Sequence, residues 1–367
     1  MTLASVEVRL AEVSAVRIGA GAIDAARACM EEVVRAGERA VLVTDERVGA
    51  LWSPRLLRGL EVPLVRVANG EACKDFAHLQ RVLEFCASSR LERSSTVFTL
   101  GGGAVSDLGG LAASLYMRGT RVVHCPTTLL AQVDAAIGGK TAINSSAGKN
   151  LIGSFHHPAA VFCDTSLLAS LDEADWRSGL GEVVKVALIA GEELLALLEK
   201  HADAIAARDP EQLAGVVEAC VRVKAGVVER DPAEAGERRI LNLGHTFAHA
   251  IEHGAGLGSI PHGVAVAAGI VLALDCAARL GMLEDPELPA RARALLERFA
   301  LPTSLAALPG RPELRVERLL EAMQLDKKNR AGGVRLVLPR AAGSIAWDVE
   351  VSREFLRAFL ERLLPAR

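Results

Sequence analysis

The stretch STVFTLGGGAVSDLGG, residues 95–110, decides the fold of the first half of this chain. A β-branched, apolar run ends in three glycines at 101–103, and a helical pattern begins near Val105. Glycines at such a turn let a phosphate approach the backbone, and the following helix N-terminus favours negative charge. The stretch matches neither G-x-G-x-x-G nor the Walker P-loop, so a purely structural turn is an equally open interpretation.

Similar patterns surround this stretch. RAVLVTD (39–45) and TRVVHCPTT (120–128) read as strands, and DFAHLQRVLEFCASS (75–89) reads as a helix. Strands alternating with helices predict an α/β domain with a parallel sheet over residues 1–172. Ligands bind at the carboxyl ends of such strands, where Asp45, the three glycines, Thr127 and Thr128 fall.

The remainder, residues 173–367, follows a different pattern. Ala-, Leu-, Glu- and Arg-rich stretches such as 191–207 and 287–300 predict a second domain that is mostly helical. One exception, GVRLVLPRAAGSIAWDV (333–349), reads as a short hairpin.

Composition excludes several classes of function. The 367 residues carry a formal net charge of −3, so the chain lacks the excess of positive charge that is typical of proteins that bind nucleic acid. Seven cysteines without a C-x-x-C pair indicate a reducing compartment. The N-terminus lacks the pattern of a signal peptide, and the longest apolar run, 263–274, falls short of the ~20 residues of a membrane helix. We therefore expect a cytoplasmic protein that binds neither membrane nor nucleic acid.

Two stretches place charged residues in unusual surroundings. QVDAAIGGKTAINSSAGKN (132–150) sets Lys140 and Lys149 in glycine- and serine-rich loops, which suits a phosphorylated small molecule, although solvated surface lysines are the plainer interpretation. GLGEVVKVALI (179–189) puts Glu182 and Lys185 on one face of an apolar helix. They form either an intrahelical ion pair or a metal carboxylate beside a substrate-binding lysine.

Residues 241–263, LNLGHTFAHAIEHGAGLGSIPHG, hold four of the nine histidines. His245 and His249 are four apart, a spacing that suits two imidazole ligands of one metal ion. Spacing alone favours this pair, with Glu252 or His253 one turn further on. Two histidines and a carboxylate with one free coordination position are typical of a catalytic metal site.

Taken together, these stretches resemble 3-dehydroquinate synthase of the shikimate pathway, within the sugar phosphate cyclases. The matching segments lie in order between about residues 70 and 328: GGGAVSDLGG, YMRGT, PTTLLAQVDAAIGGKTAIN, GKNLIG, GLGEVVKVALI, RRILNLGHTFAHAIEHG, PHG and LDKK. The resemblance implies a Rossmann-like domain that binds NAD, followed by a helical domain that binds a metal ion and the substrate.

The resemblance also assigns residues to roles. It implies that Glu182, His245 and His262 hold zinc or cobalt, while His249 lies beside the metal. We expect His253 to be mostly a helix-end residue. Residues implied to act on the substrate are Lys140, Lys185, Lys224, Arg238, Asn242 and His249, with one further cation from Lys327 or Lys328. Residues implied to bind NAD or lie in its loops are Asp45, Glu71, Lys74, Gly103, Ala104, Val105, Ser106, Asp107, Thr127, Thr128, Lys140 and Lys149.

The implied reaction converts 3-deoxy-arabino-heptulosonate 7-phosphate into 3-dehydroquinate, with transient oxidation by NAD, loss of phosphate, hydride return and an internal aldol closure. A homodimer is the implied assembly. The chain departs from the family pattern at Ser106, Val186, Ala248 and Val264. These departures keep open a paralogous cyclase acting on an amino-substituted substrate. Two rival interpretations are a metal- and NAD-dependent polyol dehydrogenase and a non-catalytic relative.

Overall fold

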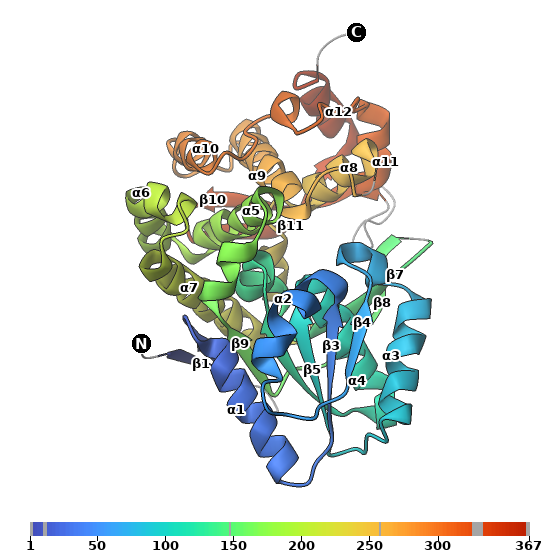
Figure 1. The fold of residues 1–367 in the computed structure, drawn as a ribbon. Coiled ribbons are helices and arrows are strands. Elements are labelled where there is room, and N and C mark those ends of the chain that lie inside the picture. The colour runs from blue at the N-terminus through green and yellow to red at the C-terminus, as the bar shows by residue number, and fades with distance from the viewer. Residues whose placement is uncertain (1–2, 10–12, 147, 257, 325–332, 365–367) are drawn as a thin grey trace. The chain divides into compact units, whose positions relative to one another are not determined.

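The computed structural model describes residues 3–9, 13–146, 148–256, 258–324 and 333–364. The chain forms two compact units, which are coloured along the sequence in Figure 1. The first unit comprises the residues up to Leu171 together with Leu213–Ala233, and the second comprises Asp172–Gln212 and the residues from Glu234 onward.

A seven-stranded sheet forms the centre of the first unit. Its spatial order is β1-β2-β9-β6-β5-β3-β4, with β1 antiparallel to β2 and all other neighbours parallel. The strands are β1 (Ala4–Arg9), β2 (Val13–Ile18), β3 (Ala40–Asp45), β4 (Leu64–Val67), β5 (Thr96–Gly101), β6 (Arg121–Pro126) and β9 (Ala160–Cys163). The predicted α/β domain with a parallel sheet is confirmed.

Helices cover both faces of this sheet because its inner strands are apolar on both sides. On β3, Val41 and Val43 belong to the core cluster shared with α3 and α4, whereas Leu42 belongs to the cluster shared with α1 and α2. The helices are α1 (Ala22–Arg35), α2 (Glu46–Leu56), α3 (Phe76–Ser88) and α4 (Gly103–Leu115). Such two-sided burial is typical of parallel sheets.

Shorter elements complete the first unit. A π-helical turn, η3 (Ala131–Ala135), precedes an antiparallel hairpin of β7 (Lys140–Ser145) and β8 (Gly148–Phe155). Three 3-10 turns are η1 (Gly70–Cys73), η2 (Tyr116–Arg118) and η4 (Thr165–Ser170). Single π-helical turns occur frequently at functional sites, and η3 contains Asp134.

The long helix α7 (Pro210–Arg230) returns the chain to the first unit. The predicted single boundary between residues 172 and 173 does not account for this, because Leu213–Ala233 belong to the first unit. Helical periodicity predicts that α7 is amphipathic, but it does not reveal which unit covers the apolar face that includes Leu213, Val217 and Val221.

The second unit is mostly helical, as predicted. Its helices are α5 (Glu173–Ala190), α6 (Glu192–Ala206), α8 (His245–Ala255), α9 (His262–Arg279), α10 (Leu288–Arg298), α11 (Val316–Gln324) and α12 (Arg353–Glu361), with 3-10 turns η5 (Glu237–Asn242) and η6 (Leu305–Ala307). The predicted hairpin is confirmed as β10 (Gly333–Ala341) paired with β11 (Ser344–Ser352).

Helix α9 is the core helix of this unit. Its length and composition alone would allow it to cross a membrane, but 78% of the tested window is buried inside the protein. Helices α5 and α8 both pack against it. An apolar helix buried in this way is typical of a protein core.

Two glycines allow α5 and α9 to approach closely. A Cβ atom on Gly181 would lie 2.0 Å from the carbonyl oxygen of Gly263, and one on Gly263 would lie 1.7 Å from the carbonyl oxygen of Ser178. The amide of Gly263 donates a 2.9 Å hydrogen bond to Ser178 Oγ. This backbone approach brings Glu182, which follows Gly181, near His262, which precedes Gly263.

Candidate functional site

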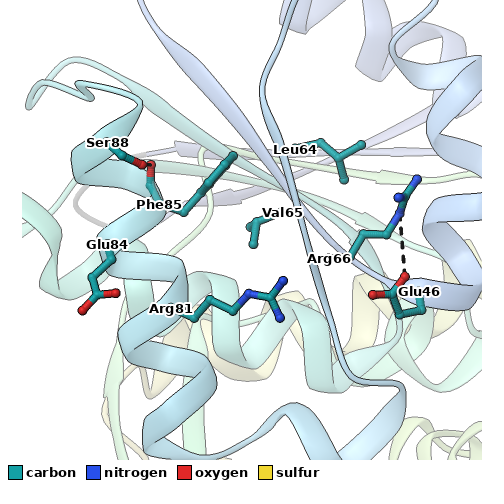
Figure 2. A pocket seen from close by; sticks show the side chains of 8 residues that line it. All are labelled: Glu46, Leu64, Val65, Arg66, Arg81, Glu84, Phe85 and Ser88. Atoms are coloured by element: carbon teal, nitrogen blue, oxygen red, sulfur yellow. Dashed lines mark hydrogen bonds and ion pairs between the residues drawn. The ribbon is translucent and has the colours of Figure 1, made fainter.

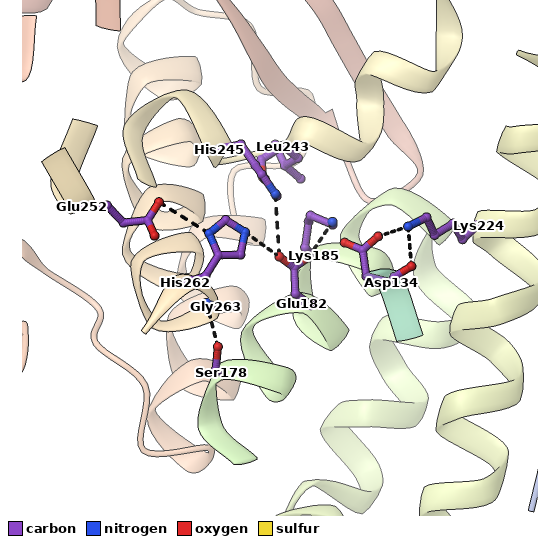
Figure 3. Close-up of polar contacts among 10 residues, drawn as sticks. All are labelled: Asp134, Ser178, Glu182, Lys185, Lys224, Leu243, His245, Glu252, His262 and Gly263. Atoms are coloured by element: carbon purple, nitrogen blue, oxygen red, sulfur yellow. Dashed lines mark hydrogen bonds and ion pairs between the residues drawn. The ribbon is translucent and has the colours of Figure 1, made fainter. Parts of the chain in front are cut away.

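One carboxylate and two imidazoles meet in the second unit. Glu182 comes from the middle of α5, His245 begins α8 and His262 begins α9. Glu182 Oε1 lies 3.4 Å from His262 Nε2 and 3.7 Å from His245 Nε2. Figure 3 shows both rings directed at this carboxylate.

These three side chains fit a metal ion. One potential ligand atom from each lies within 4.8 Å of the others, and Glu182 is 1% exposed. A carboxylate oxygen with two imidazole nitrogens is a donor set that zinc accepts in catalytic sites, and nitrogen and oxygen ligands also accept cobalt. The geometry brings together the three residues that the family resemblance assigns to the metal.

Glu182 also pairs with Lys185 one turn along α5. Lys185 Nζ lies 2.5 Å from Glu182 Oε2, and both side chains are about 1% exposed. The predicted intrahelical ion pair therefore exists. It uses one carboxylate oxygen, while the other oxygen faces the histidines, so the ion pair and the metal carboxylate are compatible interpretations.

A second cluster shares His262. His249, Glu252 and His262 also place potential ligand atoms within 4.8 Å of one another. Glu252 Oε2 lies 3.5 Å from His262 Nδ1. Neither cluster found among the described residues contains both His245 and His249, the pair favoured by spacing, although their ring centroids are 5.7 Å apart.

The two carboxylates change the pKa of the His262 imidazole. Burial opposes its charged form, but hydrogen bonding to Glu182 and Glu252 outweighs burial and raises the pKa of His262 to about 10. A histidine binds a metal ion only through an unprotonated nitrogen. Metal binding at His262 is therefore coupled to release of a proton.

The turn η5 carries two further predicted site residues. Arg238 is completely buried, and Asn242 Nδ2 donates a 2.7 Å hydrogen bond to Glu234 Oε1. The neighbouring Arg239 forms an ion pair with Asp348 of β11. The Arg239–Asp348 ion pair fixes η5 to the hairpin of the same unit, and the Asn242–Glu234 hydrogen bond fixes it to the segment that precedes it.

In the first unit, the glycine turn leads directly from β5 into α4. The helix begins at Gly103, two residues before the predicted start, and Gly102 is its N-cap without a side-chain hydrogen bond. A Cβ atom on Gly103 would lie 2.9 Å from Ala135 Cβ, and one on Gly102 would lie 3.2 Å from Thr128 Cγ2. A helix N-terminus approached through glycines fits the phosphates of a dinucleotide.

A buried lysine lies beside this turn. Lys74, 3% exposed, lies 2.5 Å from Asp107 Oδ2 and also donates to Asn150 Oδ1. Burial raises the pKa of Asp107 despite the opposing influence of Lys74. Glu71 accepts a 2.8 Å hydrogen bond from Asn144 Nδ2. The structure thus brings Glu71, Lys74 and Asp107 together.

Other predicted cofactor residues lie at the carboxyl ends of the strands on either side of β5. Asp45 ends β3 and caps α2, where its Oδ1 accepts a 2.7 Å hydrogen bond from the amide of Val48. Burial raises the pKa of Asp45. Thr127 and Thr128 follow β6, and Thr128 Oγ1 accepts a 3.2 Å hydrogen bond from the amide of Ala131.

The predicted basic residues are distributed over several elements. Lys224 of α7, 5% exposed, donates to the side chain of Asp134 and, at 2.6 Å, to its carbonyl oxygen. Lys140 begins β7 and is exposed, whereas Lys149 lies in β8 near the hairpin turn. Lys327 and Lys328 lie outside the described residues.

A cavity of about 640 Å³ lies elsewhere in the first unit, as Figure 2 shows. Its lining residues are Glu46, Leu64, Val65, Arg66, Arg81, Glu84, Phe85 and Ser88. None of the predicted site residues is among these eight. The cavity adjoins β4, the edge strand, and carries no part of the candidate site.

Sequence reasoning missed two polar residues that hold site residues in place. Asn144 contacts Glu71, and Glu234 contacts Asn242. Asn144 lies near the end of β7, in a stretch rich in serine and asparagine, a composition that favours local hydrogen bonding. The four departures from the family pattern are all buried, and none replaces a predicted ligand: Ser106, Val186, Ala248 and Val264.

Two family models match consecutive parts of the chain. The model described as 3-dehydroquinate synthase N-terminal matches residues 64–178, and the one described as 3-dehydroquinate synthase C-terminal matches residues 179–329. A curated 3-dehydroquinate synthase from Halorhodospira halophila (strain DSM 244 / SL1) is 47% identical over 319 residues, which cover 87% of each chain.

Solved structures share the fold. A 2-deoxy-scyllo-inosose synthase complexed with carbaglucose-6-phosphate, NAD+ and Co2+ superposes with a TM-score of 0.84 at 22% identity, covering 99% of this chain and 100% of that one. A 2-epi-5-epi-valiolone synthase from Streptomyces hygroscopicus subsp. jinggangensis 5008, with NAD+ and Zn2+ bound, gives 0.79 at 30% identity, covering 89% and 91%.

Proposed function

The chain belongs to the 3-dehydroquinate synthase family, and we propose that it converts 3-deoxy-arabino-heptulosonate 7-phosphate into 3-dehydroquinate with release of phosphate. The structural observation that best supports this function is the cluster of Glu182, His245 and His262. The two matched family segments together span residues 64–329, so the resemblance includes both the glycine turn and this cluster.

We assign zinc or cobalt to Glu182, His245 and His262. Bound there, the metal ion supplies a Lewis acid for a substrate hydroxyl. The contribution of the protein is to keep three ligand atoms within 4.8 Å and to neutralise the second oxygen of Glu182 through Lys185. His249 lies beside this cluster, 5.7 Å from His245 between ring centroids, and is proposed to assist in the pocket.

We assign NAD to the carboxyl edge of the first sheet. When bound, NAD supplies reversible hydride transfer. The residues proposed to hold it are Asp45, Glu71, Lys74, Gly103, Ala104, Val105, Ser106, Asp107, Thr127, Thr128, Lys140 and Lys149. The glycine turn provides close backbone approach, and the Lys74–Asp107 ion pair fixes polar groups beside the N-terminus of α4.

We propose that cationic and amide side chains bind the phosphorylated acid substrate: Lys140, Lys185, Lys224, Arg238 and Asn242. Guanidinium and ammonium groups bind phosphate and carboxylate oxygens through charge-assisted hydrogen bonds. Contacts with Asp134 and Glu234 hold Lys224 and Asn242 in fixed positions before substrate arrives. A homodimer in the cytoplasm is the proposed state of the protein.

The test measures phosphate release from 3-deoxy-arabino-heptulosonate 7-phosphate by protein loaded with zinc and NAD, while absorbance records NADH. We expect stoichiometric phosphate without accumulating NADH, because the redox cycle is internal. Phosphate release should be lost in Glu182→Gln and kept in Glu218→Gln, a matched control whose carboxylate pairs with Arg222 at the surface of α7.

Two other results would contradict the proposal. Absence of phosphate release by protein that binds zinc and NAD would favour an amino-substituted substrate of a paralogous cyclase. Steady NADH production from a simple polyol would identify a dehydrogenase instead.

A further inference from the structure

The imidazole of His262 lies between two carboxylates. Its Nε2 is 3.4 Å from Glu182 Oε1, and its Nδ1 is 3.5 Å from Glu252 Oε2. Figure 3 shows the ring between Glu182 of α5 and Glu252 of α8. Each ring nitrogen therefore has its own carboxylate, and the Glu182 oxygen nearest Nε2 also lies 3.7 Å from His245 Nε2.

Glu252 occupies a costly position for a carboxylate. It is 3% exposed, and it lies three residues before the end of α8 at Ala255. Burial of a charged group requires polar partners, and negative charge near a helix C-terminus is unfavourable. A nearby N–H donor offsets part of this cost. His262 Nδ1 can supply such a donor, at the outer limit of hydrogen-bonding distance.

We propose that Glu252 is a positioning residue that accepts a hydrogen bond from His262 Nδ1 and so keeps Nε2 as the metal-binding nitrogen. Histidine ligands of metal ions commonly donate their other ring N–H to a carboxylate, which fixes the tautomer and the ring orientation. The inference rests on the metal site of the proposed function. It also decides between the two clusters that share His262, since it makes Glu252 a partner of a ligand rather than a ligand.

The experiment measures metal affinity instead of turnover. Zn2+ affinity is determined by chelator competition, and Co2+-substituted protein is studied by visible absorption. Glu252→Leu removes charge and acceptor, whereas Glu252→Gln keeps an amide oxygen that can still accept from Nδ1. We expect a loss of about 10–100-fold in metal affinity for the leucine variant and a smaller loss, about three- to tenfold, for the glutamine variant.

Three further readouts separate positioning from ligation and from a purely structural role. The Co2+ spectrum of Glu252→Gln should keep the wild-type band positions, because the ligand set is unchanged. His249→Gln should change metal affinity by less than about twofold, because the cluster that contains His249 is not the metal site. Thermal unfolding of the metal-free variants measures any structural effect separately.

Several results would overturn the inference. Wild-type affinity in both Glu252 variants would remove the positioning role, and a changed Co2+ spectrum in Glu252→Gln would make Glu252 a ligand. Loss of metal in His249→Gln would transfer the metal to the other cluster. A wild-type protein that binds neither Zn2+ nor Co2+ would overturn both this inference and the metal site of the proposed function, whereas the first three results leave a metal-binding enzyme intact.

Discussion

Replacing Gly263 by alanine should damage the metal cluster without touching any proposed ligand. The new Cβ would lie 1.7 Å from the carbonyl oxygen of Ser178, whereas Cβ atoms essentially never approach other atoms within 3.0 Å. Since the obstructing atom belongs to the backbone of α5, no side-chain rotation relieves the contact. The start of α9 must move away from α5 by roughly 1.3 Å, the difference between these distances.

This displacement is large compared with what a metal site tolerates. Ligand distances in metal sites stay within about 0.2 Å of their preferred values. His262 directly precedes Gly263, so the movement separates His262 from Glu182. We expect metal affinity to fall at least about tenfold, and the free energy of unfolding of the metal-free protein to fall by about 1–3 kcal/mol, the usual cost of overpacking.

Gly215→Ala provides the matched control. Gly215 also lies within a helix, α7, and a Cβ atom there would meet nothing within 4 Å. The same substitution should leave metal affinity unchanged and increase stability by about 0.5–1 kcal/mol, because alanine is the better helix former. Chelator competition and chemical denaturation measure both quantities. Wild-type metal affinity and stability in Gly263→Ala would refute the argument that backbone approach sets the cluster.

Three further predictions concern the first unit. Burial lowers the pKa of His124 to about 3, so below pH 6.5 this histidine is protonated in the unfolded chain but stays neutral in the folded chain. The free energy of unfolding should therefore fall by about 1 kcal/mol between pH 7 and 5.5. Chemical denaturation of His124→Gln at both pH values should show a fall that is smaller by this amount. Lys74→Met leaves the carboxylate of Asp107 without its ion pair; denaturation should show a loss of about 3 kcal/mol, and a double variant with Asp107→Asn should recover part of it. Lys224→Gln removes the positive charge that pairs with Asp134. In steady-state kinetics with 3-deoxy-arabino-heptulosonate 7-phosphate, kcat/KM should fall by about 10–100-fold, which is the equivalent of one charge-assisted hydrogen bond. The affinity for NAD should stay unchanged.

Local sequence patterns predict the elements of both units well. Strands β3, β5 and β6 and helix α3 match their predicted stretches within a residue or two, because β-branched runs and helical periodicity are local properties. The predicted start of α4 falls two residues late, since Gly102 and Gly103 have little helical propensity of their own. The return of α7 to the first unit depends on which surface covers its apolar face, and that information is not local.

Spacing alone gives an incomplete account of the histidines. The i, i+4 rule detects neighbours on one helix, so it favours His245 and His249 and does not consider a ligand from α5. The structure groups His245 with Glu182, 63 positions earlier, and with His262 on a different helix. Only the resemblance to a family connects these three residues in the sequence, because no periodicity relates them.

The glycines beside the proposed ligands carry the long-range information that the histidine spacing lacks. Gly181 and Gly263 each adjoin a proposed ligand, and each would place a Cβ atom within 2.0 Å of a backbone carbonyl oxygen on the other helix. Larger side chains at either position would hold the helices at the usual separation of roughly 8–10 Å between axes. The positions of Glu182 and His262 therefore depend on the absence of a side chain at their neighbours. A glycine that adjoins a potential ligand in an apolar helix thus indicates a point where a second helix can approach.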